Sequence, residues 1–518
     1  MRLSELLKCL DIHFEGNPLK GKPDPEILGV GEHSSEVLPG HLFFARQGTK
    51  VSGTQYLAEA LKRGAAAILT DQDLQTLSIP SNIPAMKVPS ISDAESKIAN
   101  YFYGFPSKNL TVSGVTGTNG KTTFTYLMES IAKKAGIRTG IIGTINYRIP
   151  KTDSDESEFF PSTNTTPNAL RLQKILHEMV QRKTQVAVLE VSSHALALGR
   201  VDGIEFDGAV FTNLTQDHLD FHRTMDDYFL AKSKLFTELF TDLKAPISGH
   251  PSKKFCAPFA AINIDDPYGK ILVKKCAVNV LEYSAENPAK IYAKDIQLSS
   301  SGTVFNLVID DQTMPIKSSL VGQHNVYNIL SAAAAATAMR ISNRAIIDGI
   351  EAVRAIPGRL ELVTSSKKKQ PKFSVFVDYA HTEDALKNVL NALKVFARGR
   401  IITVFGCGGD RDRSKRPLMG KSAAHLSDWV ILTSDNPRSE DPEKIILDIE
   451  IGIRNSDKKN YEIIEDREKA VRQAIAMAEE NDIVLLAGKG HETYQIYKDK
   501  TIHFDDREIA AEALRKLT

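Results

Sequence analysis

The fold is decided by one stretch of the sequence, Leu110-Thr-Val-Ser-Gly-Val-Thr-Gly-Thr-Asn-Gly-Lys-Thr-Thr123. Its β-branched beginning predicts a strand, its glycines a loop, and the apolar residues that follow at helical spacing a helix. Gly117 and Gly120 allow backbone N–H groups to turn toward one centre, where the helix also directs its positive dipole end. This order predicts a phosphate-binding site, with Lys121 along the β- and γ-phosphates and the Thr122 hydroxyl on Mg²⁺.

The match to the general phosphate-loop pattern is incomplete. That pattern has a glycine five residues before Gly120, whereas this chain has Val115 there and Gly114 one residue further back. The alternative is a glycine-rich turn with an incidental lysine. The order of strand, GKTT and helix favours the phosphate site.

The composition indicates a globular protein with small-molecule partners. Its 518 residues, 42% apolar and 25% charged, suit two to four domains. The 65 basic and 64 acidic residues leave a net charge of +1, which offers no field for nucleic acid or an anionic membrane. The four cysteines form no CxxC pair, and no apolar run reaches the roughly 18 residues of a spanning helix. We expect a soluble, cytoplasmic monomer.

Three α/β domains are expected. Residues 1–108 carry short strand patterns such as Gly40–Ala45 and end in Gly and Pro residues. Residues 109–355 alternate apolar strands with helices, which is typical of a mainly parallel sheet covered on both faces. Residues 356–518 repeat this alternation.

Polar residues follow two predicted strands of the central domain. Glu190 lies in the strand Val186–Val191, and His218 follows the strand Gly208–Phe211. Because ligand groups gather beyond the carboxyl ends of parallel strands, both side chains are expected to converge on the phosphate loop as a second metal position. Each alone is more often a structural hydrogen-bonding group, so the hypothesis depends on their joint placement.

The predicted strands of the third domain end in four polar, glycine-containing or turn-forming loops. On one sheet edge these loops predict a binding rim, and they are Asp378–His381, Gly406–Asp412, Ser434–Arg438 and Gly488–Glu492. Ordinary connections between strands and helices are the alternative. A phosphate loop, metal-capable residues and an arginine-rich rim suggest ATP-driven transfer onto a substrate bound between domains.

Six motifs are spread over the chain: Gly117-Thr-Asn-Gly-Lys-Thr-Thr123, Glu190-Val-Ser-Ser-His194, Thr212-Asn-Leu-Thr-Gln-Asp-His-Leu-Asp220, His324-Asn-Val-Tyr-Asn328, Gly358-Arg-Leu-Glu361 and Asp378-Tyr-Ala-His381. Together they resemble the Mur ligases, the amide-bond-forming synthetases of bacterial cell-wall precursor assembly. The resemblance implies an N-terminal UDP-binding domain, a central ATPase domain, and a C-terminal Rossmann-like domain that delivers an amino acid.

Within that family, the loop Asp435-Asn-Pro-Arg438 is similar to that of members that use meso-diaminopimelate. The implied reaction uses ATP to phosphorylate the D-glutamyl γ-carboxylate of UDP-N-acetylmuramoyl-L-Ala-D-Glu, and the amino group of meso-diaminopimelate then attacks the acyl phosphate. The carboxylate and the γ-phosphoryl group repel each other, so Lys121 and two Mg²⁺ ions must neutralise both. L-lysine or another amino acid is the alternative substrate.

The resemblance also implies a set of site residues. The expected ATP-binding residues are Thr116, Gly117, Thr118, Asn119, Gly120, Lys121, Thr122, Thr123, Asn328 and Arg359. Those expected to bind the UDP-muramoyl-dipeptide are Ser34, Asn164, Thr165, Thr166, Ser192 and Arg200. The expected catalytic and metal-binding residues are Lys121, Thr122, Glu190, His218, and Lys232 as a CO₂-derived carbamate. A carbamate needs a neutral amine and turns a cation into an anion; without the resemblance, Lys232 would be taken for a surface helix lysine.

The amino-acid pocket is expected in the third domain. Its residues would be Arg411, Asp435, Asn436, Pro437, Arg438, Gly488 and Glu492. Arg411 and Arg438 suit carboxylates, and diaminopimelate has one more carboxylate than lysine at its distal end. A lysine-adding relative would need an acidic or neutral residue in place of Arg438.

The sequence departs from the family pattern mainly on the uridine side. His33-Ser-Ser35 stands where most members have Asp-Ser-Arg, and Thr49-Lys-Val51 replaces the uridine-side residues. Leu198 replaces a glutamine, and Glu383 replaces a proline. These departures affect the expected UDP contacts and leave the chemistry unchanged.

Two further alternatives are weighed. A related ligase, such as folylpolyglutamate or cyanophycin synthetase, is disfavoured by the loop Asp435–Arg438. A non-catalytic nucleotide sensor with the same fold is disfavoured because Lys121, Thr122, Glu190, His218 and Lys232 are all present.

Overall fold

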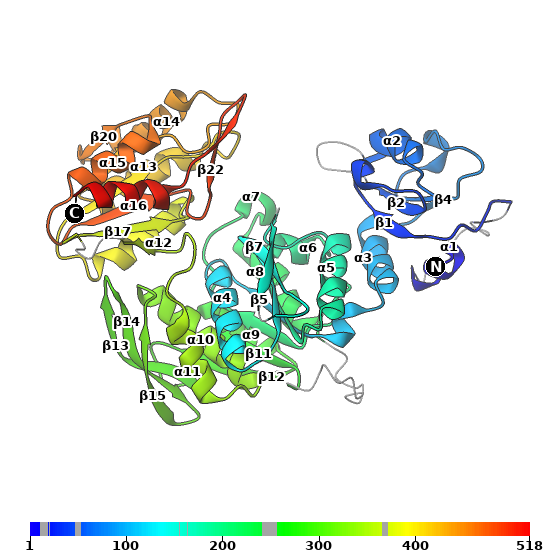
Figure 1. The fold of residues 1–518 in the computed structure, drawn as a ribbon, viewed down its shortest axis with the longest axis horizontal. Helices are drawn as coiled ribbons and strands as arrows, with labels where there is room; N and C mark the ends of the chain where they lie inside the picture. Colours follow the sequence, from blue (N-terminus) through cyan, green and yellow to red (C-terminus); the bar gives the residue numbers. More distant parts are fainter. Residues whose placement is uncertain are drawn as a thin grey trace. The chain divides into compact units, whose positions relative to one another are not determined.

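The computed structural model describes residues 1–10, 19, 21–46, 53–154, 156–162, 164–240, 256–364 and 371–517 (Figure 1). The chain divides into two compact units. The first contains residues 1–214, 218–282 and 334–343, and the second contains residues 215–217, 283–333 and 344–518. This division differs from the three predicted domains, whose boundaries at 108 and 355 stay predictions. The departure at residues 49–51 lies outside the described residues.

The N-terminal part of the first unit holds a parallel sheet of four short strands. They are β1 (Gly29–Gly31), β2 (His41–Ala45), β3 (Ala67–Thr70) and β4 (Ala85–Lys87), paired in that order. The helices α2 (Leu57–Lys62) and α3 (Ile91–Phe102) pack against residues of this sheet. Separate apolar clusters pack around α2 and around α3. The predicted strand at 40–45 is therefore confirmed.

The central sheet of the first unit is built around the predicted phosphate-loop strand. Five strands pair in parallel in the order β11 (Phe259–Asn263), β10 (Gly208–Phe211), β5 (Thr111–Thr116), β9 (Val186–Glu190) and β6 (Thr139–Ile142). Beyond β6, the strands β7 (Asn146–Pro150) and β8 (Ser157–Pro161) are antiparallel. The main helices are α4 (Lys121–Lys134), α5 (Ala169–Gln181), α6 (Ser193–Ala197) and α8 (Met225–Thr237). The expected mainly parallel sheet is confirmed.

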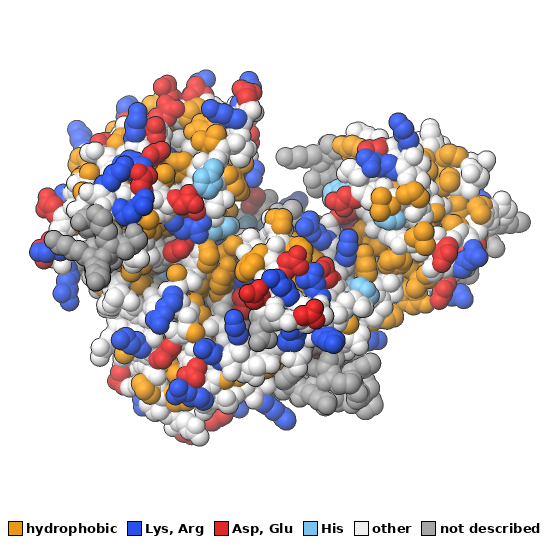
Figure 2. All heavy atoms as spheres, viewed as in Figure 1, with side chains coloured by type: hydrophobic (Ala, Val, Ile, Leu, Met, Phe, Trp, Pro, Cys, Tyr) orange, Lys and Arg blue, Asp and Glu red, His pale blue; other side chains and the backbone are white. Residues whose placement is uncertain are grey.

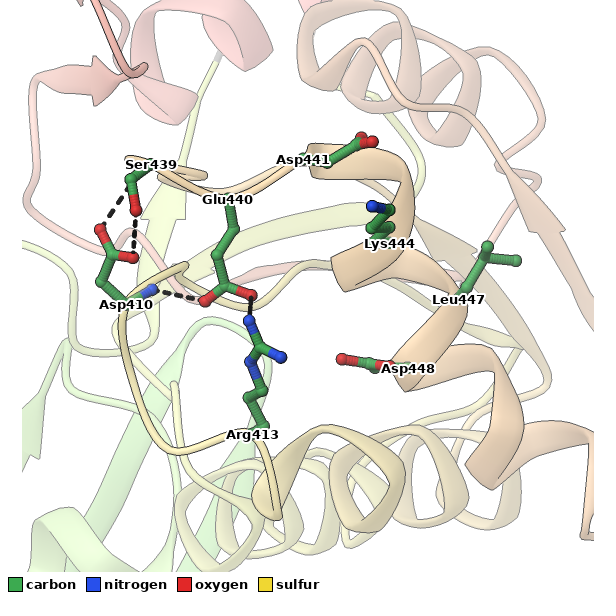
Figure 3. Close-up of a pocket in the computed structure, with 8 residues that line it drawn as sticks. All are labelled: Asp410, Arg413, Ser439, Glu440, Asp441, Lys444, Leu447 and Asp448. Carbon is green, nitrogen blue, oxygen red and sulfur yellow. Dashed lines mark hydrogen bonds and ion pairs between the residues drawn. The ribbon is translucent and has the colours of Figure 1, made fainter.

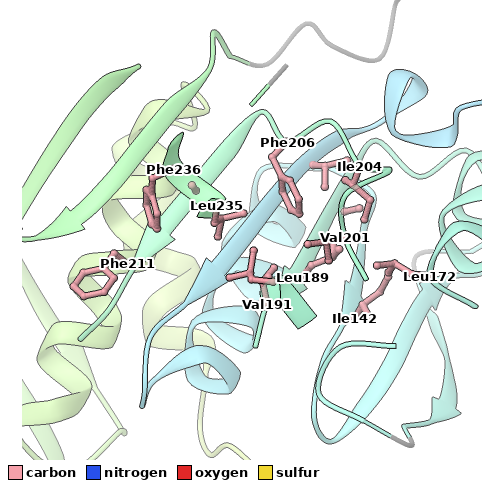
Figure 4. Close-up of a cluster of buried hydrophobic side chains, with 14 of the residues drawn as sticks. Ile142, Leu172, Leu189, Val191, Val201, Ile204, Phe206, Phe211, Leu235 and Phe236 are labelled. Carbon is pink, nitrogen blue, oxygen red and sulfur yellow. The ribbon is translucent and has the colours of Figure 1, made fainter. Parts of the chain in front are cut away.

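One apolar cluster fixes the strands of this sheet. Every residue of β5, β9 and β10 is buried, and Figure 4 shows Leu189, Val191 and Phe206 among the packed side chains. Each such side chain contributes about 1.5–3 kcal/mol on burial. Gly114 belongs to this packing, because a Cβ there would lie 2.8 Å from the Phe206 ring. Gly114, which lies one residue away from the glycine position of the phosphate-loop pattern, is therefore required for the packing of β5 and not for the loop.

The second unit begins with an antiparallel meander. The strands β13 (Ile291–Ser299), β14 (Gly302–Ile309) and β15 (Gln312–Ser318) pair in sequence order, and β13 also pairs in parallel with the end of β12 (Asn279–Ser284). The helices α10 (Gln323–Ala338) and α11 (Asn343–Ala352) follow. Residues 334–338, at the end of α10, belong to the first unit.

The C-terminal sheet carries the predicted rim. Its order is β16 (Glu361–Val363), β17 (Ser374–Asp378), β21 (Ile483–Ala487), β18 (Ile401–Phe405), β19 (Trp429–Leu432) and β20 (Tyr461–Ile463). All neighbours are parallel except β16 and β17. The helices are α12 (Glu383–Lys394), α13 (Lys415–Leu426), α14 (Pro442–Arg454), α15 (Arg467–Ala476) and α16 (Asp506–Leu517), and a hairpin of β22 (Tyr494–Ile496) and β23 (Thr501–His503) precedes α16.

The four predicted loops share one edge of that sheet. They follow β17, β18, β19 and β21, which are adjacent and parallel. Apolar clusters cover both faces of the sheet, so the side chains that are free to bind a ligand lie at its edges. The placement of the loops on a common edge is confirmed.

The surface shows basic and acidic side chains interspersed on the face drawn in Figure 2, in keeping with the net charge of +1. Within the described ranges, no helix combines the length and the apolar character needed to cross a membrane.

Candidate functional site

The loop between β5 and α4 is shaped by the chain that follows β10. Gly117 has φ 146° and Gly120 has φ 93°, conformations that favour glycine. A Cβ on Gly117 would lie 1.9 Å from Thr212 Oγ1, so any side chain there would clash with Thr212 and displace the loop. The amide of Thr118 donates to Asn213 O at 2.9 Å, and the amide of Asn119 donates to Asn213 Oδ1 at 3.0 Å. Thr212 and Asn213 therefore support the loop that the sequence predicted to bind phosphates.

Two lysine ammonium groups meet at one carbonyl of this loop. Lys121 Nζ donates to Gly117 O at 2.8 Å and to Thr118 O at 2.9 Å. Lys232 Nζ, from α8, donates to the same Gly117 O at 2.9 Å and lies 4.6 Å from the centre of the Tyr228 ring. The loop thus carries a concentrated positive charge beside the start of α4.

Lys232 is buried, with a relative exposure of 2%. The surface position that it would have been given without the family resemblance is therefore excluded. Lys232 lies four residues from Tyr228 and four from Phe236, both buried on the same face of α8. That spacing was the signal that could have placed it inside. A carbamylated Nζ would retain one N–H, so the contact with Gly117 O is compatible with the expected modification.

Glu190 and Thr122 form an oxygen pair suited to Mg²⁺. The Thr122 hydroxyl donates to Glu190 Oε2 at 3.1 Å, and the carboxylate is 1% exposed. The Thr144 hydroxyl donates to Glu190 Oε2 at 2.8 Å, and the Thr144 amide donates to Oε1 at 3.0 Å. A buried carboxylate beside a hydroxyl at a phosphate loop fits a hard cation that keeps phosphate and water ligands.

His218 is connected to the loop through Tyr228. Its ring makes an edge contact with the Tyr228 ring, with centroids 6.1 Å apart, and the Tyr228 hydroxyl lies 3.2 Å from Thr118 Oγ1. Among the residues for which the structure gives positions, no group of three or more His, Cys, Asp or Glu side chains could hold a metal by itself. A metal held by Glu190, Thr122 or His218 would therefore take part of its ligands from the substrate or water.

Most residues expected to contact the muramoyl-dipeptide form one hydrogen-bonded network. The Thr144 and Thr165 hydroxyl oxygens lie 3.1 Å apart, and the Thr166 hydroxyl donates to Glu190 O at 2.8 Å. The Ser192 amide donates to Thr166 Oγ1 at 3.0 Å. Arg200 Nη1 donates to Thr166 O at 3.1 Å. The structure brings these predicted residues to the edge that also carries Glu190.

Thr144 was missed by the sequence reasoning. It lies two residues beyond the end of β6, which is the direct neighbour of β9. A search of every strand end, and not only of those with charged residues, would have found it.

The remaining expected substrate contacts and departures lie elsewhere. The Ser34 hydroxyl donates to Glu59 Oε2 at 2.7 Å in the N-terminal part, and the Asn164 carbonyl accepts from the Ser162 hydroxyl. Leu198 is exposed at the end of α6. Glu383 begins α12, where an acidic side chain stabilises the helix dipole.

The expected ATP contacts Asn328 and Arg359 belong to the second unit, whereas residues 116–123 belong to the first. Asn328 is buried, and its Nδ2 donates to Asn325 Oδ1 at 3.0 Å. Arg359 lies over the Tyr379 ring, 5.3 Å from its centroid. Their role in binding ATP stays a prediction.

The rim of the C-terminal sheet brings Asn436 and Glu492 together. Asn436 Nδ2 donates to Glu492 Oε2 at 2.8 Å, while Asn436 Oδ1 accepts from the Ile496 amide at 3.0 Å. Burial, followed by the nearby Asp435 carboxylate, raises the pKa of Glu492. Gly488 has φ 109°, and a Cβ there would lie 2.8 Å from Asp435 Oδ2. These four predicted residues therefore share one polar surface.

Lys489, in the loop Gly488–Glu492, is a further member of this group, and no role was predicted for it. Its side chain is fully buried, and Nζ donates to Asn436 Oδ1 at 3.2 Å. Nζ also pairs with Glu492 Oε2 at 3.4 Å. The buried ammonium of Lys489 offsets part of the negative charge of Glu492 and the nearby Asp435.

Arg438 is held in an unusual conformation. Its φ is 53°, and its amide donates to Ile496 O at 3.0 Å. Its Nη1 donates to Gly409 O at 2.9 Å, and a Cβ on Gly408 would lie 2.8 Å from Nη1. Arg411 is exposed on the neighbouring loop, with Nη1 donating to Asp410 O at 3.2 Å. The glycines after β18 thus leave room for the Arg438 side chain to reach across to that loop.

A cavity of about 650 Å³ lies beside these loops. Figure 3 shows the eight residues that line it, and they include Asp410 and Ser439, the chain neighbours of Arg411 and Arg438. None of the residues expected to bind diaminopimelate lines it.

Three family models match this chain in order. They are "Mur ligase family, catalytic domain" at residues 26–103, "Mur ligase middle domain" at residues 115–336, and "Mur ligase, glutamate ligase domain" at residues 358–490. The chain belongs to the Mur ligase family. The matches span both the phosphate loop and most of the C-terminal rim.

Relatives within the Mur ligase family extend over the full chain. A protein of Clostridium botulinum named "UDP-N-acetylmuramoyl-L-alanyl-D-glutamate--2,6-diaminopimelate ligase" is 41% identical over 517 residues, covering 100% of both chains. A protein of Bacillus velezensis with the same name is 44% identical over 517 residues, covering 100% of this chain and 99% of its own. A solved structure of a ligase with this name is 32% identical with a TM-score of 0.64, covering 99% of each chain.

These comparisons confirm the expected fold class, a mixed α/β Mur ligase architecture of N-terminal, middle and C-terminal domains. They also confirm that the protein is an ATP-dependent, amide-bond-forming ligase. The resemblance that the sequence motifs suggested is therefore established for the whole chain.

Proposed function

We propose that this Mur ligase adds meso-diaminopimelate to the D-glutamyl γ-carboxylate of UDP-N-acetylmuramoyl-L-Ala-D-Glu in peptidoglycan precursor synthesis. The observation that carries the proposal is the rim of the C-terminal sheet, where Asp435, Asn436, Arg438 and Glu492 lie together. Full-length relatives named for the same amino acid support it. The reaction consumes ATP and releases ADP and phosphate.

The first half of the reaction belongs to the loop at 116–123. Lys121 would turn from Gly117 O and Thr118 O to the β- and γ-phosphates, because phosphate oxygens are stronger acceptors for an ammonium than backbone carbonyls. Glu190 and Thr122, with His218 and Lys232 near the same loop, would hold Mg²⁺. Mg²⁺, when bound, would supply neutralisation of the γ-phosphoryl group. The D-glutamyl carboxylate could then approach the phosphorus to form an acyl phosphate.

The second half requires an amine in a fixed position. Asp435 and Glu492 supply negative charge for an ammonium group of the amino acid, and Asn436 offers an amide between them. Attack requires the neutral amine, and a carboxylate near it can accept the proton. The carbonyl–phosphate bond breaks as the amide bond forms, and phosphate leaves.

Selection of diaminopimelate would depend on its distal carboxylate. Arg438 and Arg411 present planar guanidinium groups from adjoining loops, and such groups bind carboxylates through two parallel hydrogen bonds. L-lysine lacks this carboxylate and would leave the arginines without a partner.

Other parts of the proposal follow from the family. Residues 1–108 would bind the uridine nucleotide, residues 109–355 ATP, and residues 356–518 the amino acid. Lys232 would carry a carbamate, and the protein would act as a cytoplasmic monomer.

The proposal is tested by measuring phosphate release from purified protein with UDP-N-acetylmuramoyl-L-Ala-D-Glu, ATP and Mg²⁺. Release should require meso-diaminopimelate, and a Lys121→Ala variant should lose at least about 100-fold in kcat, since the ammonium is a principal charge on the transferred group. An unchanged rate in that variant, or release that ignores the amino acid, would overturn the proposal.

A further inference from the structure

The two arginines expected to select diaminopimelate lie on different loops. Arg411 follows β18, and Arg438 follows β19. Two guanidinium groups can bind one ligand productively only if their loops keep a fixed separation. A displacement of the ligand by about 1 Å can lower the rate roughly 10²-fold. Residues with no assigned role tie these loops together, and Figure 3 shows most of them.

Glu440, two residues after Arg438, reaches the loop of Arg411. Its Oε1 accepts from the Asp410 amide at 2.7 Å and from Arg416 Nη2 at 2.9 Å. Its Oε2 accepts from Arg416 Nη1 at 3.1 Å and pairs with Arg413 at 2.9 Å. One carboxylate therefore binds backbone and side chains across residues 410–416.

Asp410 makes the reverse connection. Its carboxylate accepts from the Ser439 hydroxyl at 2.5 Å and from the Ser439 amide at 3.2 Å. Asp410 immediately precedes Arg411, and Ser439 immediately follows Arg438. Each loop thus holds the residue beside the other loop's arginine, while Arg438 Nη1 donates to Gly409 O. We call Asp410, Ser439, Glu440 and Arg416 the loop clasp.

Arg416 anchors the loop clasp in the domain interior. Its side chain is fully buried and also donates to Asp448 Oδ2 at 2.9 Å and to Gly408 O at 3.3 Å. The hydrogen bonds from Arg416 lower the pKa of Glu440 to about 2, so that the pair stays ionised at neutral pH. Ionised, buried and doubly hydrogen-bonded pairs define one geometry more sharply than exposed pairs do.

We propose that Glu440 is a positioning residue for amino-acid selection. It acts through the loop clasp to keep Arg411 and Arg438 at a fixed separation. This inference rests on the proposed function, because it takes meso-diaminopimelate as the ligand of the two arginines. Glu440 itself would not touch the substrate. Its loss should weaken capture of the distal carboxylate and leave the phosphate loop, which belongs to the other unit, unaffected.

The test compares Glu440→Gln and Asp410→Asn with the parent enzyme. For Glu440→Gln we expect the KM for meso-diaminopimelate to rise about tenfold or more, and the preference for meso-diaminopimelate over L-lysine to fall by a similar factor. The KM values for ATP and for the nucleotide dipeptide should stay within about twofold. Glu443→Gln is the matched control. Glu443 is exposed at the start of α14, and its substitution removes the same charge as Glu440→Gln.

Asp410→Asn keeps the test decisive if Glu440→Gln fails to fold. Asp410 is exposed, so its change should leave the thermal midpoint nearly unaltered while raising the KM for meso-diaminopimelate about threefold or more. The inference is overturned if folded variants keep the parent KM for meso-diaminopimelate, or if the KM values of all three substrates rise together. A parent enzyme that does not use meso-diaminopimelate would instead overturn the proposed function and this inference with it.

Discussion

Replacing Arg438 by methionine should convert a selective enzyme into one that barely distinguishes two amino acids. Arg438→Met removes the guanidinium but keeps a Cβ, so the cost of the backbone at φ 53° is the same in both proteins. Each hydrogen bond to a charged group contributes about 1.5–3 kcal/mol, and two of them to a carboxylate about 3 kcal/mol or more. Since 1.4 kcal/mol is a factor of ten, kcat/KM for meso-diaminopimelate should fall about 100-fold or more.

The substitution also removes the hydrogen bond from Nη1 to Gly409 O, which is lost whichever amino acid is bound. That loss loosens the loop for every amino acid. L-lysine has no distal carboxylate, so its kcat/KM should fall by no more than about tenfold. The ratio of the two kcat/KM values therefore isolates the contribution of the carboxylate.

The assay follows phosphate release at saturating ATP and nucleotide dipeptide while either amino acid is varied. Arg454→Met is the matched control, because Arg454 is exposed on α14, where it pairs with Glu450 at 2.9 Å and interacts with Tyr461. Such a pair contributes little, and the control should keep the parent ratio. If Arg438→Met keeps the parent ratio, Arg438 does not read the distal carboxylate and the explanation of selectivity is wrong.

Three further changes test other parts of the molecule. Gly117→Ala should reduce kcat/KM for ATP about 100-fold or more, since its Cβ would meet Thr212 Oγ1 at 1.9 Å; a nucleotide titration that matches the parent would contradict this. Glu190→Gln should raise the Mg²⁺ concentration for half-maximal rate about tenfold or more, measured by metal titration, and an unchanged midpoint would remove Glu190 from the metal site. Arg467→Met should lower the free energy of unfolding by about 3–5 kcal/mol, because Asp506 would lose its fully buried partner at 2.7 Å; denaturant unfolding that shows less than about 1 kcal/mol would refute it.

The parts of the site that could be predicted from the sequence are those formed by residues that are consecutive in the chain. The strand, two glycines and lysine at 110–121 predicted a strand, a loop and a helix, and the structure shows β5, the loop and α4 there, with Thr212 and Asn213 supporting the loop from a distant part of the chain. The rim loops could be predicted because each follows a buried parallel strand, which places its first residues at the same sheet edge.

The parts that escaped prediction depend on contacts between distant residues. Thr144 and Glu190 are 46 residues apart, and Glu440 and Asp410 are 30 apart, so that no local pattern links them. Lys232 could be placed at the site only through the family resemblance, for a different reason. A lysine on a helix is normally exposed, and here the carbonyl of Gly117, 115 residues away, accepts a hydrogen bond from its ammonium group. Such pairings can be seen only once the sheet has brought the strand ends together.

The most direct test of the proposed amino-acid selection is a competition between meso-diaminopimelate and L-lysine at equal concentration, with ATP, Mg²⁺ and UDP-N-acetylmuramoyl-L-Ala-D-Glu. Mass spectrometry of the nucleotide products reports which amino acid was joined. The diaminopimelate product should exceed the lysine product by about 100-fold, with one phosphate released for each product formed. A comparable yield of the lysine product, or phosphate release without any new amide, would contradict it.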